Sequence, residues 1–117
     1  MSAKAQREFW KKFYEALDAG DADTAAALFP DGTRIHLWDG RTFTTQAEFR
    51  AWFQTLHSRS DNAKRSIVAF NVSGDVSDVV VVLRASYEGE ERTVRLRHTF
   101  RFEGDHLVEV DVAIDPL

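Results

Sequence analysis

The sequence predicts an α+β domain in which N-terminal helices lie in the concave side of a curved, cone-shaped antiparallel sheet. Three observations predict this fold. Apolar residues recur at helical spacing in three segments before about residue 58, and they alternate with polar residues from about residue 64 onward. Short turns that contain glycine separate the alternating segments. A chain of 117 residues has the length of one domain, so we expect a single domain over residues 1–117.

Composition excludes several classes of function. The net charge of −4 argues against a dedicated nucleic-acid-binding protein, which is normally basic. The chain has no cysteine, which excludes a disulfide, a thiolate nucleophile and a cysteine-ligated metal. We find no targeting signal and no apolar run long enough to span a membrane, so we expect a soluble protein that does not bind membranes.

Two helices are predicted before the first strand. Ala5–Asp18 places its large apolar residues three and four positions apart, and Gly20 follows as a stop signal. A shorter helix begins at Asp21 and continues through Ala25–Leu28.

A short hairpin and a third helix are predicted next. Thr33–Trp38 and Arg41–Thr44 read as two strands around a turn at Asp39-Gly40. Thr45 and Glu48 then form a capping-box pattern, in which the Glu48 side chain is expected to reach back to the Thr45 amide. The helix is expected to end near residue 58 and to bury four residues, namely Phe49, Trp52, Phe53 and Leu56.

The remaining chain predicts a four-stranded meander over Lys64–Val72, Val76–Tyr87, Arg92–Phe102 and His106–Asp115. A two-residue turn at residues 89–90 and a three-residue turn at residues 103–105 keep the apolar faces of neighbouring strands together. The predicted pairs are Leu83 with Leu96, Val81 with His98, and His98 with Val110.

The strand Lys64–Val72 does not keep one alternation phase. Phe70 matches the inner face of the next strand, whereas Arg65 and Ile67 have the opposite parity. A β-bulge near residues 68–69 brings both of these residues to the inner face as well.

Polar residues on dry faces are the candidates for chemistry. His98 lies between Leu96 and Phe100 on the inner face of its strand, and the pattern fits a core imidazole and the polar tip of a pocket about equally. Tyr14 and Asp18 lie four apart on one helix stripe. Taken singly, Tyr14 is more often a core ring, Asp18 a solvated carboxylate at a helix end and Arg65 an exposed charge on an edge strand. No histidines pair at metal-ligand spacing, so we expect no metal site.

The architecture resembles the nuclear-transport-factor-like superfamily, also called ketosteroid-isomerase-like or SnoaL-like, with a cystatin-like fold. The resemblance is carried by Phe13-Tyr-Glu-Ala-Leu-Asp18 and by Gly20-Asp-Ala-Asp-Thr-Ala25. A closer resemblance, over essentially the whole chain, is to designed luciferases built on this fold. It is carried by Ile35-His-Leu-Trp-Asp-Gly40, Thr42-Phe-Thr44, Phe49-Arg-Ala-Trp-Phe53 and Ile114-Asp-Pro116, together with Arg65 and His98.

The closer resemblance implies a cofactor-independent luciferase that oxidises a coelenterazine-type imidazopyrazinone, with diphenylterazine as the expected substrate and O₂ as co-substrate. It implies two catalytic pairs, Tyr14 with His98 and Asp18 with Arg65. Apolar residues on the inner faces are expected to hold the substrate. They are Phe13, Leu17, Leu37, Trp38, Phe49, Trp52, Phe53, Val81, Leu83, Leu96, Phe100, Val110 and Val112.

Two other functions stay open on the sequence. One is an isomerase or hydrolase of the natural superfamily, with Asp18 as base and Tyr14 as donor. The other is a binding scaffold without chemistry. We expect a monomer because the outer face of the sheet carries charges of both signs, although Val80 and Val82 form an apolar strip there. The charged residues are Arg95, Arg97, Arg101, Glu109 and Asp111.

Overall fold

A computed structural model describes residues 1–115, and it confirms the predicted α+β class with N-terminal helices and a curved, unclosed sheet. Pro116 of the C-terminal motif and Leu117 at the end of the predicted domain lie outside the described residues. The elements are α1 (Ala3–Asp18), α2 (Ala22–Ala27), β1 (Arg34–His36), β2 (Thr42–Phe43), α3 (Gln46–Ser58), β3 (Ser60–Ser73), β4 (Val76–Tyr87), β5 (Glu90–Glu103) and β6 (His106–Asp115).

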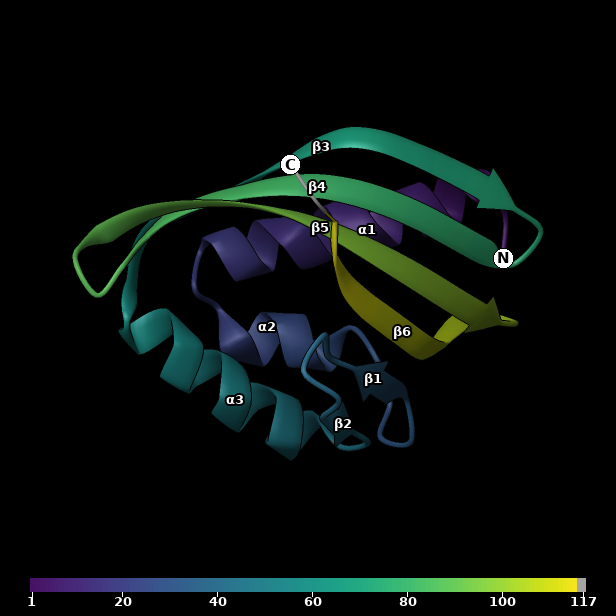
Figure 1. Ribbon diagram of the computed structural model, residues 1–117. Helices are drawn as coiled ribbons and strands as arrows, with labels where there is room; N and C mark the ends of the chain where they lie inside the picture. The colour runs from purple at the N-terminus through teal and green to yellow at the C-terminus, as the bar shows by residue number, and fades with distance from the viewer. Residues whose placement is uncertain (116–117) are drawn as a thin grey trace.

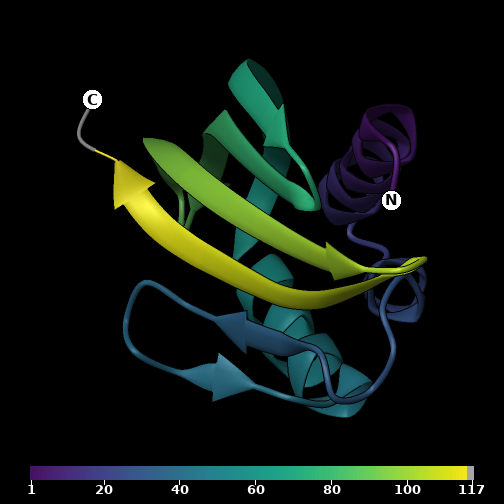
Figure 2. The same ribbon diagram turned by 90° about the vertical axis from the view of Figure 1, so that its right-hand side faces the viewer.

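The sheet has six strands in the order β2-β1-β6-β5-β4-β3. Figure 1 shows β3, β4 and β5 arching over α1, with α2 and α3 on the same concave side. Strand β1 pairs with β6 in parallel, which joins the short hairpin to the predicted meander. In Figure 2 this hairpin lies beside β6. The sheet is therefore larger than the four predicted strands.

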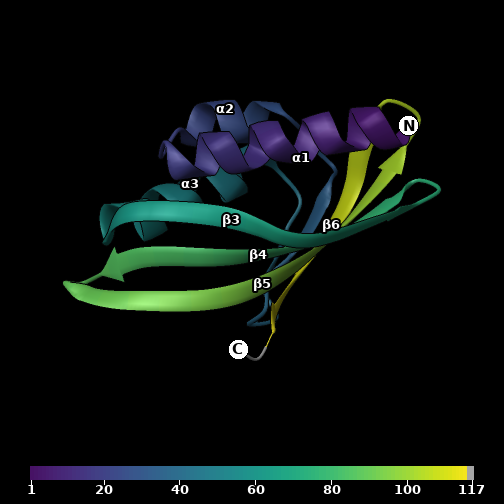
Figure 3. The same ribbon diagram turned by 90° about the horizontal axis from the view of Figure 1, so that it is seen from above.

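Helix α1 lies alongside β3, as Figure 3 shows from above. It begins at Ala3, earlier than predicted, because the Ser2 side chain accepts a hydrogen bond from the Ala5 amide. Gln6 is fully buried, and its side-chain amide donates to the Gly74 carbonyl and accepts from the Ser77 hydroxyl. These bonds fix the start of α1 to the turn between β3 and β4.

Helix α3 begins with a variant of the predicted capping box. The Thr45 hydroxyl accepts from the Glu48 amide, as in that motif. The Glu48 carboxylate accepts from the Thr44 amide at 3.2 Å, one residue before the predicted partner, and the Thr45 amide contributes a weaker hydrogen bond to the same carboxylate. Trp52 and Leu56 are only half-buried, in contrast to the prediction, because both line a cavity.

The pairing of β4 with β5 is shifted by two residues from the prediction. The turn is Glu88-Gly89, and positive φ angles of 50° and 82° at these residues are those of a type I′ turn. The predicted partners of Leu83 and Val81 were therefore wrong. The observed pairs are Val79 with His98, Val81 with Leu96, and Leu83 with Val94.

The pairing of β5 with β6 is also shifted. The turn has two residues, 104 and 105, and Val108 is the extra residue of a bulge in β6. His98 consequently lies opposite Val112, and the predicted pair with Val110 was wrong. In β3 the predicted bulge is confirmed, because Ile67 pairs with Val81 and Ala69 with Val80.

Gly20 ends α1 in the left-handed region, with a φ of 70°, and a Cβ there would lie 2.2 Å from Nε2 of His57. We expect Gly20→Ala to lower the free energy of unfolding by about 1–2 kcal/mol through backbone strain alone, and by more through displacement of the imidazole. Gly32→Ala is the matched control, since Gly32 has a φ of 96° and no atom near its Cβ position. Urea unfolding should show the larger loss for Gly20→Ala, and equal losses would contradict the contact.

The outer face of the sheet carries ion pairs, including Arg97 with Asp115 at 3.1 Å and Arg34 with Glu109 at 3.2 Å. Val80 and Val82 are half-buried on this face. We expect a monomer at micromolar concentration, because stacking two such faces would desolvate charged groups. Light scattering tests this expectation, and a dimer mass that persists on dilution would contradict it.

Candidate functional site

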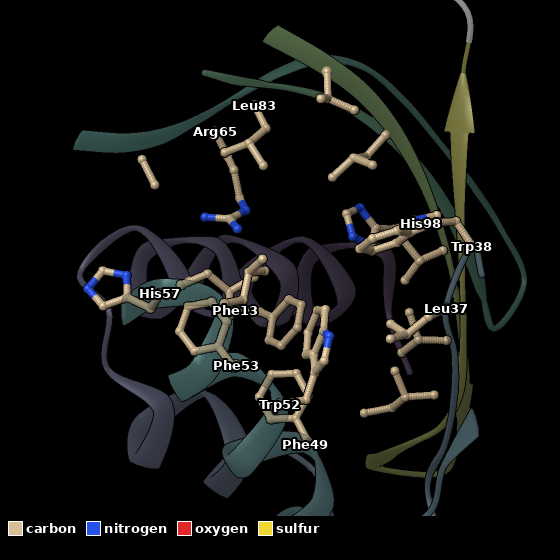
Figure 4. Close-up of a pocket in the computed structure, with 18 of the residues that line it drawn as sticks. Phe13, Leu37, Trp38, Phe49, Trp52, Phe53, His57, Arg65, Leu83 and His98 are labelled. Atoms are coloured by element: carbon tan, nitrogen blue, oxygen red, sulfur yellow. The ribbon is translucent and has the colours of Figure 1, made fainter. Parts of the chain in front are cut away.

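A cavity of about 250 Å³ lies between the helices and the concave face of the sheet, and most of the side chains that line it are apolar. Figure 4 shows Phe13, Phe49, Trp52 and Phe53 on one side of this cavity and Arg65 on the other. Phe49 and Phe53 stack with their ring centroids 6.1 Å apart. Stacked and edge-on rings of this kind form a wall of low polarity.

Most of the predicted substrate-binding residues line this cavity. They are Phe13, Leu17, Leu37, Trp38, Phe49, Trp52, Phe53, Leu83, Leu96, Val110 and Val112. Val81 and Phe100 do not line it, in contrast to the prediction, and both are fully buried. Phe100 is covered by Phe9, Phe13 and Tyr14 of α1.

Sequence reasoning missed several lining residues. Val94 has the same strand parity as Leu96 and could have been found from the alternation. The others depend on how distant segments meet. They are Phe29, Ile35, Leu56, His57, Ser60, Ala63, Ala85, Tyr87, Arg92, Leu107 and Ile114.

The structure brings Tyr14 and His98 together, with the phenolic oxygen 3.0 Å from Nδ1 of the imidazole. Burial raises the pKa of Tyr14 above its usual range, so the hydroxyl keeps its proton. Burial, and secondly the positive charge of Arg65, lower the pKa of His98 to about 3. His98 is therefore neutral at physiological pH.

The neutral pair has a preferred arrangement of protons. If Tyr14 donates to Nδ1 of His98, the buried hydroxyl proton is satisfied and Nε2 carries the ring proton. The opposite arrangement leaves a buried hydroxyl proton without an acceptor, which costs free energy. Because His98 lines the cavity, we assign it an Nε2–H donor toward the cavity.

The structure also brings Asp18 and Arg65 together. The Asp18 carboxylate accepts from the Arg65 backbone amide, at 3.1 Å to each oxygen, and from the guanidinium at 2.9 Å. The Arg65 side chain is only 7% exposed, compared with 27% for Asp18. Arg65 lines the cavity and Asp18 does not. The interpretation of Arg65 as an exposed edge charge was therefore wrong.

Two largely buried donors thus face one mostly apolar cavity, namely the guanidinium of Arg65 and the imidazole of His98 (Figure 4). The other polar side chains that line it are more exposed, namely His57, Ser60, Tyr87 and Arg92. Such a site fits a flat, largely apolar ligand that carries an oxygen with negative charge. Among residues 1–115, no group of three or more His, Asp or Glu side chains could hold a metal ion. In the same range, no helix is long and apolar enough to cross a membrane.

Comparison with known protein families identifies the family of the chain. A family model described as SnoaL-like domain matches residues 10–110. The chain belongs to the SnoaL-like domain family. Among curated proteins, none matches the sequence of this SnoaL-like protein.

Solved structures resemble this SnoaL-like fold closely at low sequence identity. A putative SnoaL-like polyketide cyclase from Jannaschia has a TM-score of 0.85 at 13% identity, over 98% of this chain and 90% of that one. An NTF2-like protein of unknown function from Burkholderia pseudomallei has a TM-score of 0.84 at 20% identity, over 98% and 92%. A hypothetical protein with a ketosteroid-isomerase-like fold from Catenulispora acidiphila, in complex with trimethylamine, has a TM-score of 0.82 at 16% identity, over 90% of this chain and 83% of that one.

The shifted pKa of His98 predicts a loss of stability in acid. An unfolded histidine takes up a proton near pH 6.5, whereas folded His98 does so only near pH 3. Between these values the unfolded state binds more protons, so stability falls as the pH falls. From pH 6.5 to 4.5 we expect a loss on the order of 2–3 kcal/mol.

The matched variant is His98→Gln, which keeps a polar side chain and does not titrate. Urea unfolding at several pH values should show a clearly flatter dependence for this variant. If the two proteins have the same slope over this window, His98 is not held neutral by the fold.

Proposed function

We propose that this SnoaL-like protein is a cofactor-independent luciferase that oxidises a coelenterazine-type imidazopyrazinone with O₂, diphenylterazine being the expected substrate. The observation that carries the proposal is the pair of donors, Arg65 and His98, that face an otherwise largely apolar cavity. The resemblance of the sequence to the designed luciferase LuxSit supports the same assignment, since a Tyr–His pair and an Asp–Arg pair face the substrate there.

The proposed reaction begins with loss of the proton on the substrate's ring nitrogen, which leaves an anion delocalised onto the carbonyl oxygen. The ring carbon next to the carbonyl adds to O₂ and gives up an electron pair to it, which forms a peroxide. The outer peroxide oxygen then attacks the carbonyl carbon, the bond from this carbon to the ring nitrogen breaks with the electron pair passing to nitrogen, and a four-membered dioxetanone results. Cleavage of its O–O and C–C bonds releases CO₂, which keeps one atom of O₂, while the other atom becomes the carbonyl oxygen of an excited amide. The substrate supplies the electrons, so this chemistry requires no flavin and no metal.

The chain's contribution is to stabilise the anion and to exclude water. Arg65 and the Nε2–H of His98 would donate to the oxygen that carries the negative charge. Each such bond contributes roughly 1.5–3 kcal/mol, or about 10- to 100-fold in rate where it acts in the transition state. Asp18 would hold the guanidinium and Tyr14 the imidazole. The aromatic wall would keep water from the excited product.

The geometry supports an isomerase or hydrolase less well. Such an enzyme needs Asp18 as a base that faces the substrate. Asp18 does not line the cavity, and both of its carboxylate oxygens accept hydrogen bonds from Arg65. The similarity to putative polyketide cyclases is at 13–16% identity and concerns the fold alone.

The test is to mix the purified protein with diphenylterazine in air and to record light, with serum albumin at the same concentration as control. We expect emission far above the control. Binding of the substrate without light would favour a scaffold. Turnover of a ketosteroid without light would favour the isomerase.

A further inference from the structure

A second imidazole faces the cavity, and the mechanism above does not use it. His57 lies in the last turn of α3 and lines the cavity together with Arg65 and His98. In Figure 4, His57 and His98 lie on opposite sides of the cavity, with the Arg65 guanidinium between them in this view. Among the cavity-lining residues within 1–115 there is no aspartate or glutamate. Histidines are therefore the candidates for a base.

His98 is poorly suited to accept a proton. Its Nδ1 is engaged by Tyr14, it is only 5% exposed, and its Nε2 carries a proton in the preferred arrangement. A proton taken up by His98 would place a second positive charge near Arg65 in a dry site, and these two effects already hold its pKa at about 3. The surroundings of His98 therefore favour a neutral imidazole that donates a hydrogen bond from Nε2.

His57 has the opposite surroundings. Within residues 1–115 neither of its ring nitrogens has a hydrogen-bond partner, and its ring stacks on Phe53 with centroids 5.9 Å apart. The ring packs over Gly20, which leaves room for it because glycine has no side chain. His57 is half-buried, so water can reach it and carry a proton away.

We propose that His57 is the general base that removes the ring N–H proton of the substrate. This inference rests on the luciferase function proposed above. The N–H bond breaks, the proton passes to a ring nitrogen of His57, and the electron pair stays in the substrate as the anion. Arg65 and His98 then stabilise the oxygen end of that anion. The arrangement fits the substrate, because its ring N–H and its carbonyl oxygen lie on opposite sides of the bicyclic ring.

The ionisation step can be measured without light. Under argon, the absorbance spectrum of bound diphenylterazine reports whether the substrate is neutral or anionic. Below the pH at which the free substrate ionises, we expect the wild-type protein to hold mainly the anion and His57→Gln to hold at least about 10-fold less of it. His106→Gln is the matched control, since this exposed histidine does not line the cavity. A His57→Gln protein that ionises the substrate as fully as the wild type overturns the proposal.

Light in air gives the second measurement. His57→Gln should emit about 100-fold more slowly at the lower pH, and within about 3-fold of the wild type at a pH where the free substrate has already lost its proton. Equal losses at both pH values would indicate a structural role and overturn the proposal. Charged and titratable groups on the surrounding elements also affect the pH profile of light emission. These groups are Asp18, Asp21, Arg59, Arg65, Tyr87 and Arg92. The effect of His57 is therefore taken as the difference between the pH profiles of His57→Gln and of its control, His106→Gln.

Chemical rescue separates the two imidazoles. Imidazole added to the buffer should raise the light emission of His57→Ala by about 10-fold or more. It should raise the light emission of His98→Ala only slightly. Rescue of His98→Ala alone would make His98 the base. If the anion forms under argon but no light appears in air, His57 keeps its role and the luciferase function fails. If light appears but does not depend on His57, only the present inference fails.

Discussion

Arg65→Ala is expected to lower the light yield of the folded protein by about 10- to 100-fold, because one charge-assisted hydrogen bond to the substrate anion is lost. The guanidinium is 7% exposed and faces the cavity, so water cannot easily take its place. The loss should appear as a smaller anionic fraction of the bound substrate and as slower emission of light, since the guanidinium interacts most strongly with the charge that develops when the substrate loses its proton.

The Asp18 variant tests whether the ion pair acts as one unit. Asp18→Ala alone should also lower the light yield, because the carboxylate holds both the guanidinium and the backbone of β3 at Arg65. Adding Asp18→Ala to Arg65→Ala should lower it little further. Arg84→Ala is a suitable control, since Arg84 is exposed on β4. The measurement is light per folded protein, with folding checked by circular dichroism. Additive losses would contradict a coupled pair, and a bright Arg65→Ala protein would remove Arg65 from the mechanism.

The sequence predicted faces better than it predicted registers. When a predicted turn is misplaced by one residue, each residue pairs with a partner two positions away from the predicted one. Because side chains along a strand return to the same face every two residues, the predicted faces stay correct. His98 and Val81 were therefore assigned to the correct face even though they are not opposite each other. The bulge in β3 could be read from the sequence because only a bulge reconciles the parity of Arg65 with that of Phe70.

The parts that sequence reasoning missed depend on contacts between distant segments. The parallel pairing of β1 with β6 joins residues more than seventy positions apart, and no local pattern encodes it. His57 reads as an ordinary residue at a helix end. It reaches the cavity only because α3 packs against the glycine that ends α1. A composition of apolar and aromatic residues predicts that a cavity will be apolar, but the docking of α3 decides which polar groups enter it.

The His98 variants distinguish a core histidine from one that serves the substrate. If His98 is only a core residue, His98→Ala should cost a few kcal/mol of stability through the cavity it leaves, and the remaining folded protein should stay bright. If its Nε2–H donates to the anion, the folded variant should bind diphenylterazine and emit about 10- to 100-fold less light.

Tyr14→Phe is the matched variant for this pair. It keeps the ring that packs on Phe13 and Phe100 and removes only the hydroxyl that holds Nδ1 of His98. The imidazole can then exchange its ring proton between the two nitrogens, so part of the population lacks the donor toward the cavity. The loss of light should therefore be smaller than for His98→Ala. The measurement is light per folded protein for the two variants, with binding followed by substrate fluorescence. A folded His98→Ala protein of undiminished brightness would leave Arg65 alone to stabilise the anion.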